Sequence, residues 1–330
     1  MTFPNVTSTG LSSKRIVVTG AAGFLGSNLV EAARASGARV LSVVRNETNA
    51  PDIVAMSSLL RDPNLLDGTD VFIHSAAVRH RYGSSPKTYR ESNVHLVEAL
   101  VRAAVNRVGR FVFISSVGVY GFPAVLPVTE QTPFAPVTLY SATKIEAERL
   151  VTRLAKQLGL PYTIIRPTII YGPGDTNGML DKLVRMIRGR RYLIVGSGDN
   201  TLHHTFISDV VDGVFRLSEN KRGLNDDFIL AGPETTTLAR LSQLVARHVD
   251  RSIPPVHVPM PFARAVASLV DIAAYRGIAF TKQEPPINHE KLDVMAVSVS
   301  FDTSKARSAG FSPRIGYEEG IARTLGQAAA

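Results

Sequence analysis

The chain has 330 residues, of which 45% are hydrophobic and 20% charged, a balance that excludes intrinsic disorder in a chain long enough for two structural units. It has no cysteine, which excludes disulfides, thiolate metal sites and cysteine nucleophiles and fits a reducing cytoplasm. The net charge of +9 comes from basic residues spread along the chain without a recognition helix or an RNA-binding motif, so no nucleic-acid partner is expected.

Residues 1–13 are polar and have no apolar signal region, which predicts a loose N-terminal tail. The first half then alternates apolar runs with helical patterns, as parallel βαβ units do. The strands are nearly continuous apolar runs, so helices are expected on both sheet faces. The expected strands are Arg15–Thr19, Arg39–Val44, Asp70–Ser75, Arg110–Ser115 and Tyr162–Arg166, and the expected helices are Phe24–Ser36, Pro86–Asn106 and Thr138–Leu158, the first and last closed by Gly37 and Gly159.

After Pro173–Gly174 the alternation becomes irregular and rich in proline. This predicts an α/β fold, a Rossmann-type doubly wound parallel sheet with a smaller C-terminal substrate-binding domain. The expected bounds are 14–175 plus about 205–230 for the first, and 176–204 and 231–330 for the second.

The most membrane-like stretch is 262–275. It contains Arg264 and Asp271 and is shorter than the roughly 20 apolar residues that a spanning helix needs. It is therefore predicted to be a packed amphipathic helix, and no membrane partner is expected.

Directly after the first strand the sequence reads TGAAGFLG, with the spacing Gly-x-x-Gly-x-x-Gly. Gly20 permits a tight turn, Gly23 lets the backbone approach a pyrophosphate, and Gly26 allows close helix–strand packing. The helix N-terminus at Phe24 and Leu25 offers N–H groups to the phosphates. Such glycines also make ordinary turns, but their place between a strand and a helix favours dinucleotide binding.

In dinucleotide-binding folds, a residue at the end of the second strand, about 20 residues after the glycine turn, contacts the adenosine ribose. An acidic residue there would bind the 2′-hydroxyl, but this chain has Arg45. A guanidinium suits a 2′-phosphate, so NADP(H) is favoured and NAD(H) is the alternative. In another interpretation Arg45 stacks on adenine or faces water.

Tyr140 and Lys144 lie four residues apart and therefore share a helix face. Reduction of a ketone needs a proton donor at the carbonyl oxygen, and oxidation of an alcohol needs the reverse. A phenol with a pKa of about 10 is a poor base near neutrality, and a nearby ammonium is expected to lower that pKa. Lys144 is also placed to hold the nicotinamide ribose. A Tyr-x-x-x-Lys pattern by itself is common on surface helices, so it indicates a catalytic pair only together with neighbouring sequence features.

The context is a pair of serines at the end of the fourth expected strand, on the edge where open α/β sheets bind ligands. A hydroxyl there can donate to the substrate oxygen and hold it beside Tyr140. Ser116 is assigned this role, and Ser115 that of a turn residue bonded to the backbone.

These segments together resemble the extended short-chain dehydrogenase/reductase family, the epimerase/dehydratase-like group. The resemblance runs in order over nearly the whole chain. It rests on Thr19–Gly26, His74–Ala77, Asn93, Ser115–Gly121, Tyr140–Lys144, Arg166–Gly174, Gly196–Asn200, Phe206–Val210 and Phe301–Pro313.

The resemblance implies that Ser116, Tyr140 and Lys144 are catalytic and that the protein is a homodimer. It further implies that Asp62 lies near the adenine. The remaining implied contacts are Ala76 and Ala77 in the cofactor cleft, Pro167 beside the nicotinamide, and Val117 on the substrate side. From their surroundings, His74 is expected to be a packed strand residue and Asn93 a helix-positioning group.

The substrate stays open at this point. Nucleotide-sugar members carry an Asn and an Arg that contact the sugar diphosphate, where this chain has Ile169 and Leu202. The segment 202–211 resembles the 3β-hydroxysteroid dehydrogenase and dihydroflavonol reductase branches instead. Arg190 and Arg191 are candidates to replace the missing anchors, or they belong to a solvated basic face.

Three hypotheses follow. The first is an NAD(P)-dependent oxidoreductase acting on a secondary alcohol or ketone of a ring-containing small molecule. The second is a nucleotide-sugar 4-epimerase or 4-ketoreductase; dehydration is not expected, because Val117 and Gly118 stand where dehydratases of the family carry acids. The third is a non-catalytic NADP-sensing protein. No metal site is expected, because the histidines form no cluster with ligand spacing.

Overall fold

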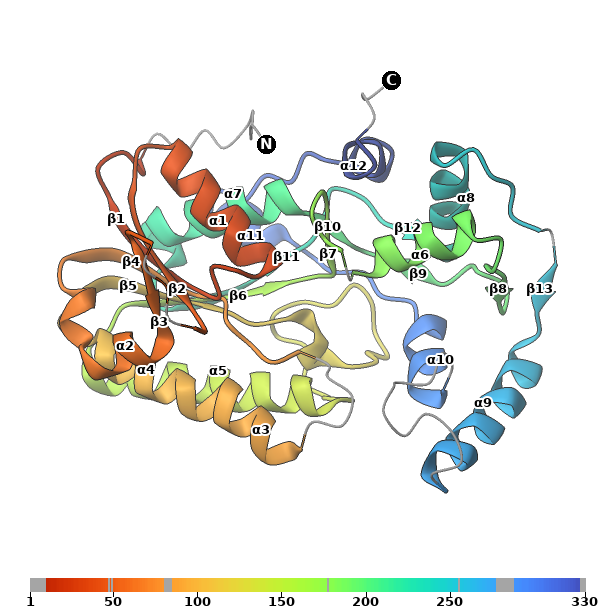
Figure 1. Ribbon diagram of the computed structural model, residues 1–330, viewed down its shortest axis with the longest axis horizontal. Coiled ribbons are helices and arrows are strands. Elements are labelled where there is room, and N and C mark those ends of the chain that lie inside the picture. Colours follow the sequence, from red (N-terminus) through yellow and green to blue (C-terminus); the bar gives the residue numbers. More distant parts are fainter. Residues whose placement is uncertain are drawn as a thin grey trace.

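The computed structural model describes residues 10–46, 48, 50–79, 85–176, 178–254, 256–276 and 288–326. A helix-covered sheet forms one side of the molecule and a smaller lobe forms the other (Figure 1). The expected tail at 1–13 lies mostly outside the described residues.

The sheet has seven strands in the order β11-β6-β5-β4-β1-β2-β3, and every neighbouring pair is parallel. This confirms the predicted fold class. The strand order reverses beside β1, and in open α/β sheets such a switch point marks the ligand crevice at the carboxyl ends of the strands. The strands are β1 (Arg15–Thr19), β2 (Arg39–Val44), β3 (Ile53–Ala55), β4 (Thr69–His74), β5 (Val108–Ile114), β6 (Tyr162–Pro167) and β11 (Asp226–Leu230).

Helices cover both sheet faces, as the apolar strands predicted (Figure 1). Alternate residues of β1 enter opposite cores: Ile16 joins the cluster beneath α1 and α7, and Val17 the cluster beneath α4 and α5. One face carries α1 (Phe24–Ala35), α7 (Ile207–Glu219) and α11 (Ser304–Ser308), and the other α2 (Met56–Arg61), α3 (Pro86–Arg90), α4 (Leu96–Ala104) and α5 (Leu139–Leu158).

Short helical turns link these elements. The predicted helix 86–106 is a continuous run in which a π-helical turn, Glu91–His95, joins α3 to α4. The 3-10 turns are η1 (Pro63–Leu66), η3 (Val117–Tyr120) and η4 (Lys221–Gly223).

The lobe contains five helices among its described residues and three small strand pairs. Its helices are α6 (Met179–Arg188), α8 (Leu238–His248), α9 (Met260–Tyr275), α10 (His289–Ala296) and α12 (Tyr317–Thr324). The strand pairs are β7 (Ile170–Tyr171) with β10 (Thr205–Phe206), β9 (Thr201–Leu202) with β12 (Thr236–Thr237), and β8 (Ile194–Val195) with β13 (His257–Val258).

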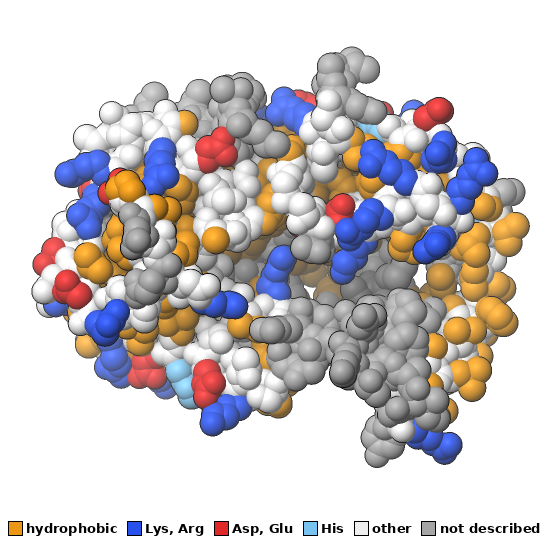
Figure 2. Space-filling model, in the orientation of Figure 1, with side chains coloured by type: hydrophobic (Ala, Val, Ile, Leu, Met, Phe, Trp, Pro, Cys, Tyr) orange, Lys and Arg blue, Asp and Glu red, His pale blue; other side chains and the backbone are white. Residues whose placement is uncertain are grey.

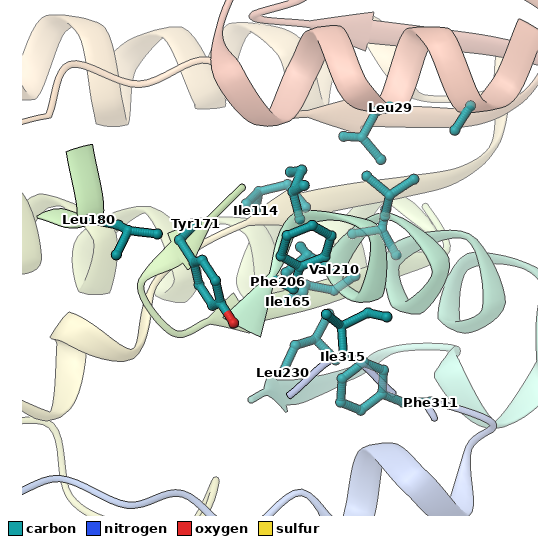
Figure 3. Packing of buried hydrophobic residues seen from close by; sticks show 14 of the residues in the cluster. Leu29, Ile114, Ile165, Tyr171, Leu180, Phe206, Val210, Leu230, Phe311 and Ile315 are labelled. Carbon is teal, nitrogen blue, oxygen red and sulfur yellow. The ribbon is translucent and has the colours of Figure 1, made fainter. Parts of the chain in front are cut away.

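One hydrophobic cluster joins the lobe to the sheet (Figure 3). It runs from Leu29 of α1 through Ile114 and Ile165 of the sheet to Phe206 and to Leu180 of α6. The lobe is therefore anchored against the carboxyl edge of the sheet, over the candidate site.

Helix α9 occupies the stretch predicted to be helical, but its packing differs from the expectation. The small side chains of Ala263 and Ala267 are buried in a cluster with Leu292 of α10. The larger Phe262 and Leu269 are 63% and 69% exposed. The prediction of a packed helix is therefore wrong for its large apolar side chains. None of the helices among the described residues has the length and apolarity to cross a membrane.

Candidate active site

The glycine turn joins β1 to α1 at the switch point of the sheet. Gly20 has φ +70°, and a Cβ there would lie 2.8 Å from the backbone nitrogen of Ala76, so a side chain is excluded by both conformation and space. A Cβ at Gly26 would lie 2.1 Å from the carbonyl oxygen of Gly20. Gly23 is the N-cap of α1 and caps it with no side chain, so the first N–H groups of the helix face outward. Bare backbone and an uncapped helix end fit a pyrophosphate.

The two residues expected near the adenosine lie on the surface beyond β2 and α2. Arg45 directly follows β2 and is exposed. Asp62 is also exposed, and its carboxylate accepts a hydrogen bond of 3.2 Å from the backbone of Asn64, which caps η1. Their roles toward a cofactor stay predictions.

The serine pair lies where β5 ends. Ser116 is half-buried, and its Oγ accepts a hydrogen bond of 3.1 Å from the Gly118 backbone, which leaves its own O–H available as a donor. Ser115 is buried, and its Oγ has no partner among the described residues. The side chain that bonds the turn is therefore Ser116, whereas the Ser115 side chain makes no such bond. Accessibility still favours Ser116 as the substrate donor.

Tyr140 and Lys144 lie in the first two turns of α5. Thr138 caps this helix through a 3.1 Å hydrogen bond from the backbone of Ser141. The Lys144 Nζ lies 5.8 Å from the centre of the Tyr140 ring and donates a 2.7 Å hydrogen bond to the Ile114 carbonyl at the end of β5. The phenol and the ammonium therefore meet at the strand end that carries Ser116.

Burial dominates the protonation of this pair. It raises the pKa of Tyr140 to about 12, with the Arg79 guanidinium acting to lower it. Burial lowers the pKa of Lys144 to about 8, opposed by the carboxylate of Glu148. The expectation that Lys144 lowers the phenol pKa is not met in the protein alone, because desolvation of the phenolate outweighs the nearby cations.

A buried ion-pair network between β6 and α5 was not predicted from the sequence. Arg166 of β6 donates to both oxygens of Glu148, at 2.6 Å from Nη2 and 3.0 Å from Nε, and to the Tyr120 hydroxyl at 2.8 Å. It also pairs with Asp227 of β11. Glu148 lies one helical turn after Lys144, so the network fixes the helix that carries the phenol and the ammonium. Only the position of Glu148 at Lys144 plus four could have signalled it.

The loop after β4 is held beside the start of α5 by hydrogen bonds of Asn93. Asn93 is buried and clamps Val78 through hydrogen bonds of 2.8 and 3.0 Å, and its amide also donates to Thr143 of α5 at 3.1 Å. The Tyr89 hydroxyl donates to the Arg79 carbonyl at 3.2 Å. Asn93 thus positions the loop after β4 as well as a helix. Ala76 lies on the same loop, its nitrogen 3.4 Å from a threonine hydroxyl of β1.

His74 is a packed strand residue, as expected. It is buried, its Nδ1 lies 2.7 Å from the hydroxyl of Thr19, and its ring stacks on Phe113. Burial lowers its pKa to about 3. No group of three or more histidines and acids among the described residues could hold a metal ion.

The arginines that were candidates to replace the missing diphosphate anchor lie apart from Ile169. Pro167, predicted beside the nicotinamide, ends β6, and Ile169 lies just beyond it, 46% exposed and lining a small cavity with Met179. Arg190 and Arg191 instead follow the other end of α6. A helix of ten residues is about 15 Å long, so the structure does not bring these arginines to Ile169.

A family model described as "NAD dependent epimerase/dehydratase family" matches residues 16–231 of the chain. The UDP-glucose 4-epimerase of Vibrio cholerae is 30% identical over 262 residues, covering 75% of this chain and 79% of the relative. A 4-hydroxy-2-methyl-3-oxo-4-farnesyl-3,4-dihydroquinoline-1-oxide ketoreductase of Stigmatella aurantiaca is 27% identical, covering 93% and 94%.

Solved structures share the fold. The chain superimposes with a TM-score of 0.73 on the UDP-glucuronic acid 4-epimerase of Bacillus cereus in complex with NAD, at 20% identity, covering 94% of this chain and 97% of that one.

Proposed function

The chain belongs to the NAD dependent epimerase/dehydratase family, and from that premise we propose that it transfers a hydride at a secondary alcohol or ketone of a ring-containing small molecule. One observation carries the proposal: the Lys144 ammonium lies 5.8 Å from the Tyr140 ring, at the strand end that also presents Ser116. In this family fold, that edge of the sheet is where a ligand meets the cofactor.

We assign the proton transfer to Tyr140. In the reductive direction its hydroxyl gives a proton to the carbonyl oxygen, and in the oxidative direction its phenolate takes one from the alcohol. Ser116 donates its O–H to the same substrate oxygen and holds it in place. The Lys144 ammonium favours the phenolate, against the larger effect of burial in the protein alone, and offers its other protons to a ribose hydroxyl. The high pKa of Tyr140 in the protein alone keeps the phenol protonated, as reduction requires.

The cofactor supplies or accepts the hydride when bound. The residues that would hold it are the glycine turn and first turn of α1 for the pyrophosphate, and Ala76, Ala77 and Pro167 along the cleft. We assign Arg45 to a 2′-phosphate, which makes NADP(H) the preferred cofactor. Titration of the protein with NADPH and NADH tests this directly, and an Arg45→Asp variant should move the preference toward NADH; tighter NADH binding by the parent chain would contradict it.

A second candidate is a nucleotide-sugar 4-epimerase, in which the hydride returns to the substrate. The relatives that act on UDP-sugars favour it. Ile169 argues against it, because its apolar side chain offers no donor to a sugar diphosphate.

The experiment follows absorbance at 340 nm with panels of cyclic ketones and alcohols, and monitors UDP-sugars by NMR. Net oxidation or reduction of added cofactor supports the first candidate, and sugar interconversion without net cofactor turnover supports the second. In either case Tyr140→Phe should lower turnover roughly 10²- to 10⁴-fold while cofactor binding persists. The control Tyr192→Phe removes a phenol of the lobe whose hydroxyl lies 2.6 Å from Ser242 Oγ, and should keep its activity. Full activity in Tyr140→Phe would reject the assigned mechanism.

A further inference from the structure

The large apolar side chains that reach solvent are concentrated at one place. Among the described residues, five such side chains are more than half exposed: Val125 (76%), Leu269 (69%), Val256 (63%), Phe262 (63%) and Ile272 (51%). Four of these five lie between 256 and 272, on the segment that enters α9 and on α9 itself. A single exposed leucine needs no explanation, but a cluster of this kind marks a contact surface.

The exposed residues form one face of the helix. Phe262, Leu269 and Ile272 follow the three- and seven-residue spacing of a helix stripe, and the buried Ala263 and Ala267 occupy the opposite side. The helix thus attaches to the lobe by its alanines and directs its largest apolar groups outward.

A basic run is joined to this face by strand pairing. Residues 182–198 contain five cations and no Asp or Glu. The cations, all exposed, are Lys182, Arg185, Arg188, Arg190 and Arg191; Arg185 pairs at 2.9 Å with Asp181, which directly precedes the run, and the other four have no acid within it. β8 follows this run and pairs in parallel with β13, which leads into α9. Leu193, 43% exposed, directly precedes β8 as Val256 precedes β13.

The apolar face and the basic run occupy the same side of the molecule. In Figure 2 hydrophobic side chains gather over β13 and α9, and Lys and Arg side chains lie above them over α6 and α8. Two acids near α9 have side chains that the structure describes: Asp293 pairs with Arg264 at 3.3 Å, and Asp271 contacts His289 at 2.8 Å.

We propose that α9 and the run 182–191 dock the protein on an anionic lipid surface. An amphipathic helix that lies in a bilayer interface buries Phe and Leu side chains among the acyl chains, while neighbouring arginines contact the headgroups. The sequence-based expectation of no membrane partner considered a spanning helix, which needs length. Lying on a surface needs only one apolar face and positive charge beside it. The proposal is independent of the proposed function.

The chain has no tryptophan, which gives a sharp test. The full-length Leu269→Trp protein is mixed with vesicles of phosphatidylcholine alone or with phosphatidylglycerol added. We expect a blue shift of its emission, and quenching by brominated acyl chains, with the anionic vesicles only. The control Leu158→Trp, at a 38% exposed leucine that ends α5, should show neither.

Vesicle flotation measures the contribution of charge. The triple variant Arg188→Gln, Arg190→Gln, Arg191→Gln should bind anionic vesicles on the order of 100-fold more weakly, about fivefold per arginine. The control triple Arg34→Gln, Arg39→Gln, Lys156→Gln removes the same net charge from exposed positions of the sheet half and should change binding far less. High salt should weaken binding by the parent chain.

Three outcomes would overturn the proposal. The first is the absence of vesicle binding by the parent chain. The second is an equal loss in both triple variants, which would indicate net charge alone. The third is a parent dimer that becomes monomeric in the Phe262→Ser, Leu269→Ser, Ile272→Ser variant, as measured by light scattering, because a second copy of the chain would then cover this face. Thermal melting of each variant verifies that it is folded.

Discussion

Phe72 of β4 is fully buried between the helix layers, whereas Phe262 of α9 is 63% exposed. Arg166 of β6 is held in a buried network, whereas Arg264 of α9 pairs with Asp293 at the surface. The difference teaches that the central strands bury their apolar and charged side chains, because helices cover both faces of the sheet. Helix α9 of the lobe is covered on one side only, so its large apolar side chains and its ion pair remain at the surface.

The largest expected effect comes from the two arginines. Arg166→Met should lower the free energy of unfolding by about 3–5 kcal/mol, because Glu148 would be left buried without its partner. Arg264→Met should change it by less than about 1 kcal/mol, since its ion pair is exposed. Urea unfolding measures both. Equal losses would show that the lobe packs its charges as the sheet half does.

The two phenylalanines test the same contrast for apolar groups. Phe72→Ala opens a cavity in a closely packed core and should cost about 3–5 kcal/mol. Phe262→Ala removes a side chain that is mostly in water and should stay within about 0.5 kcal/mol of the parent chain. A large loss for Phe262→Ala by urea unfolding would place α9 in the folded core.

Acid should weaken the protein through its buried histidines, above all His74 in the sheet and His204 in the lobe. Burial lowers the pKa of each to about 3. The unfolded chain therefore binds more protons between pH 6.5 and pH 3, so stability falls as the pH drops through this window. Each histidine should cost about 2 kcal/mol by pH 5. In urea titrations His74→Gln should show a shallower loss on acidification, and the exposed control His257→Gln should keep the slope of the parent chain.

The smallest effect concerns two helix ends. α5 ends at Gly159 with φ +68°, a conformation that glycine adopts freely, whereas Arg190 holds φ +52° just after α6. Gly159→Ala should therefore destabilise by about 1 kcal/mol, and Arg190→Gly should stabilise by up to about 1 kcal/mol. Thermal melting compares the two. A stability loss in Arg190→Gly would mean that its side chain makes contacts that outweigh the backbone strain.

Many of the strands and helices of the sheet half could be predicted from the local sequence pattern. Arg15–Thr19 and Arg39–Val44 are strands with the predicted bounds, and the two glycines predicted to close helices, Gly37 and Gly159, both have positive φ. These features depend on neighbouring residues in sequence, through apolar runs and the conformational freedom of glycine. The three-residue β3 was not predicted, because such a segment is too short to show a period.

In the candidate site, too, some features could be predicted from the sequence and others could not. The spacing of Tyr140 and Lys144 placed them on one helix face, and the strand end placed Ser116 beside them. Their proton affinities did not follow from spacing, because burial is set by what the rest of the chain lays over them. The network of Arg166 did not follow from local sequence either, since its three partners lie 18, 46 and 61 residues away.

By itself, then, the sequence determined most strands and helices of the sheet half, where the glycine turn lies, and which residue types stand at the sheet edge. The tertiary structure alone decided which of two serines bonds the turn, how far the phenol is desolvated, and which face of α9 meets water. The reason is physical: periodicity records which side chains are apolar, whereas burial depends on distant segments that supply, or fail to supply, a covering surface.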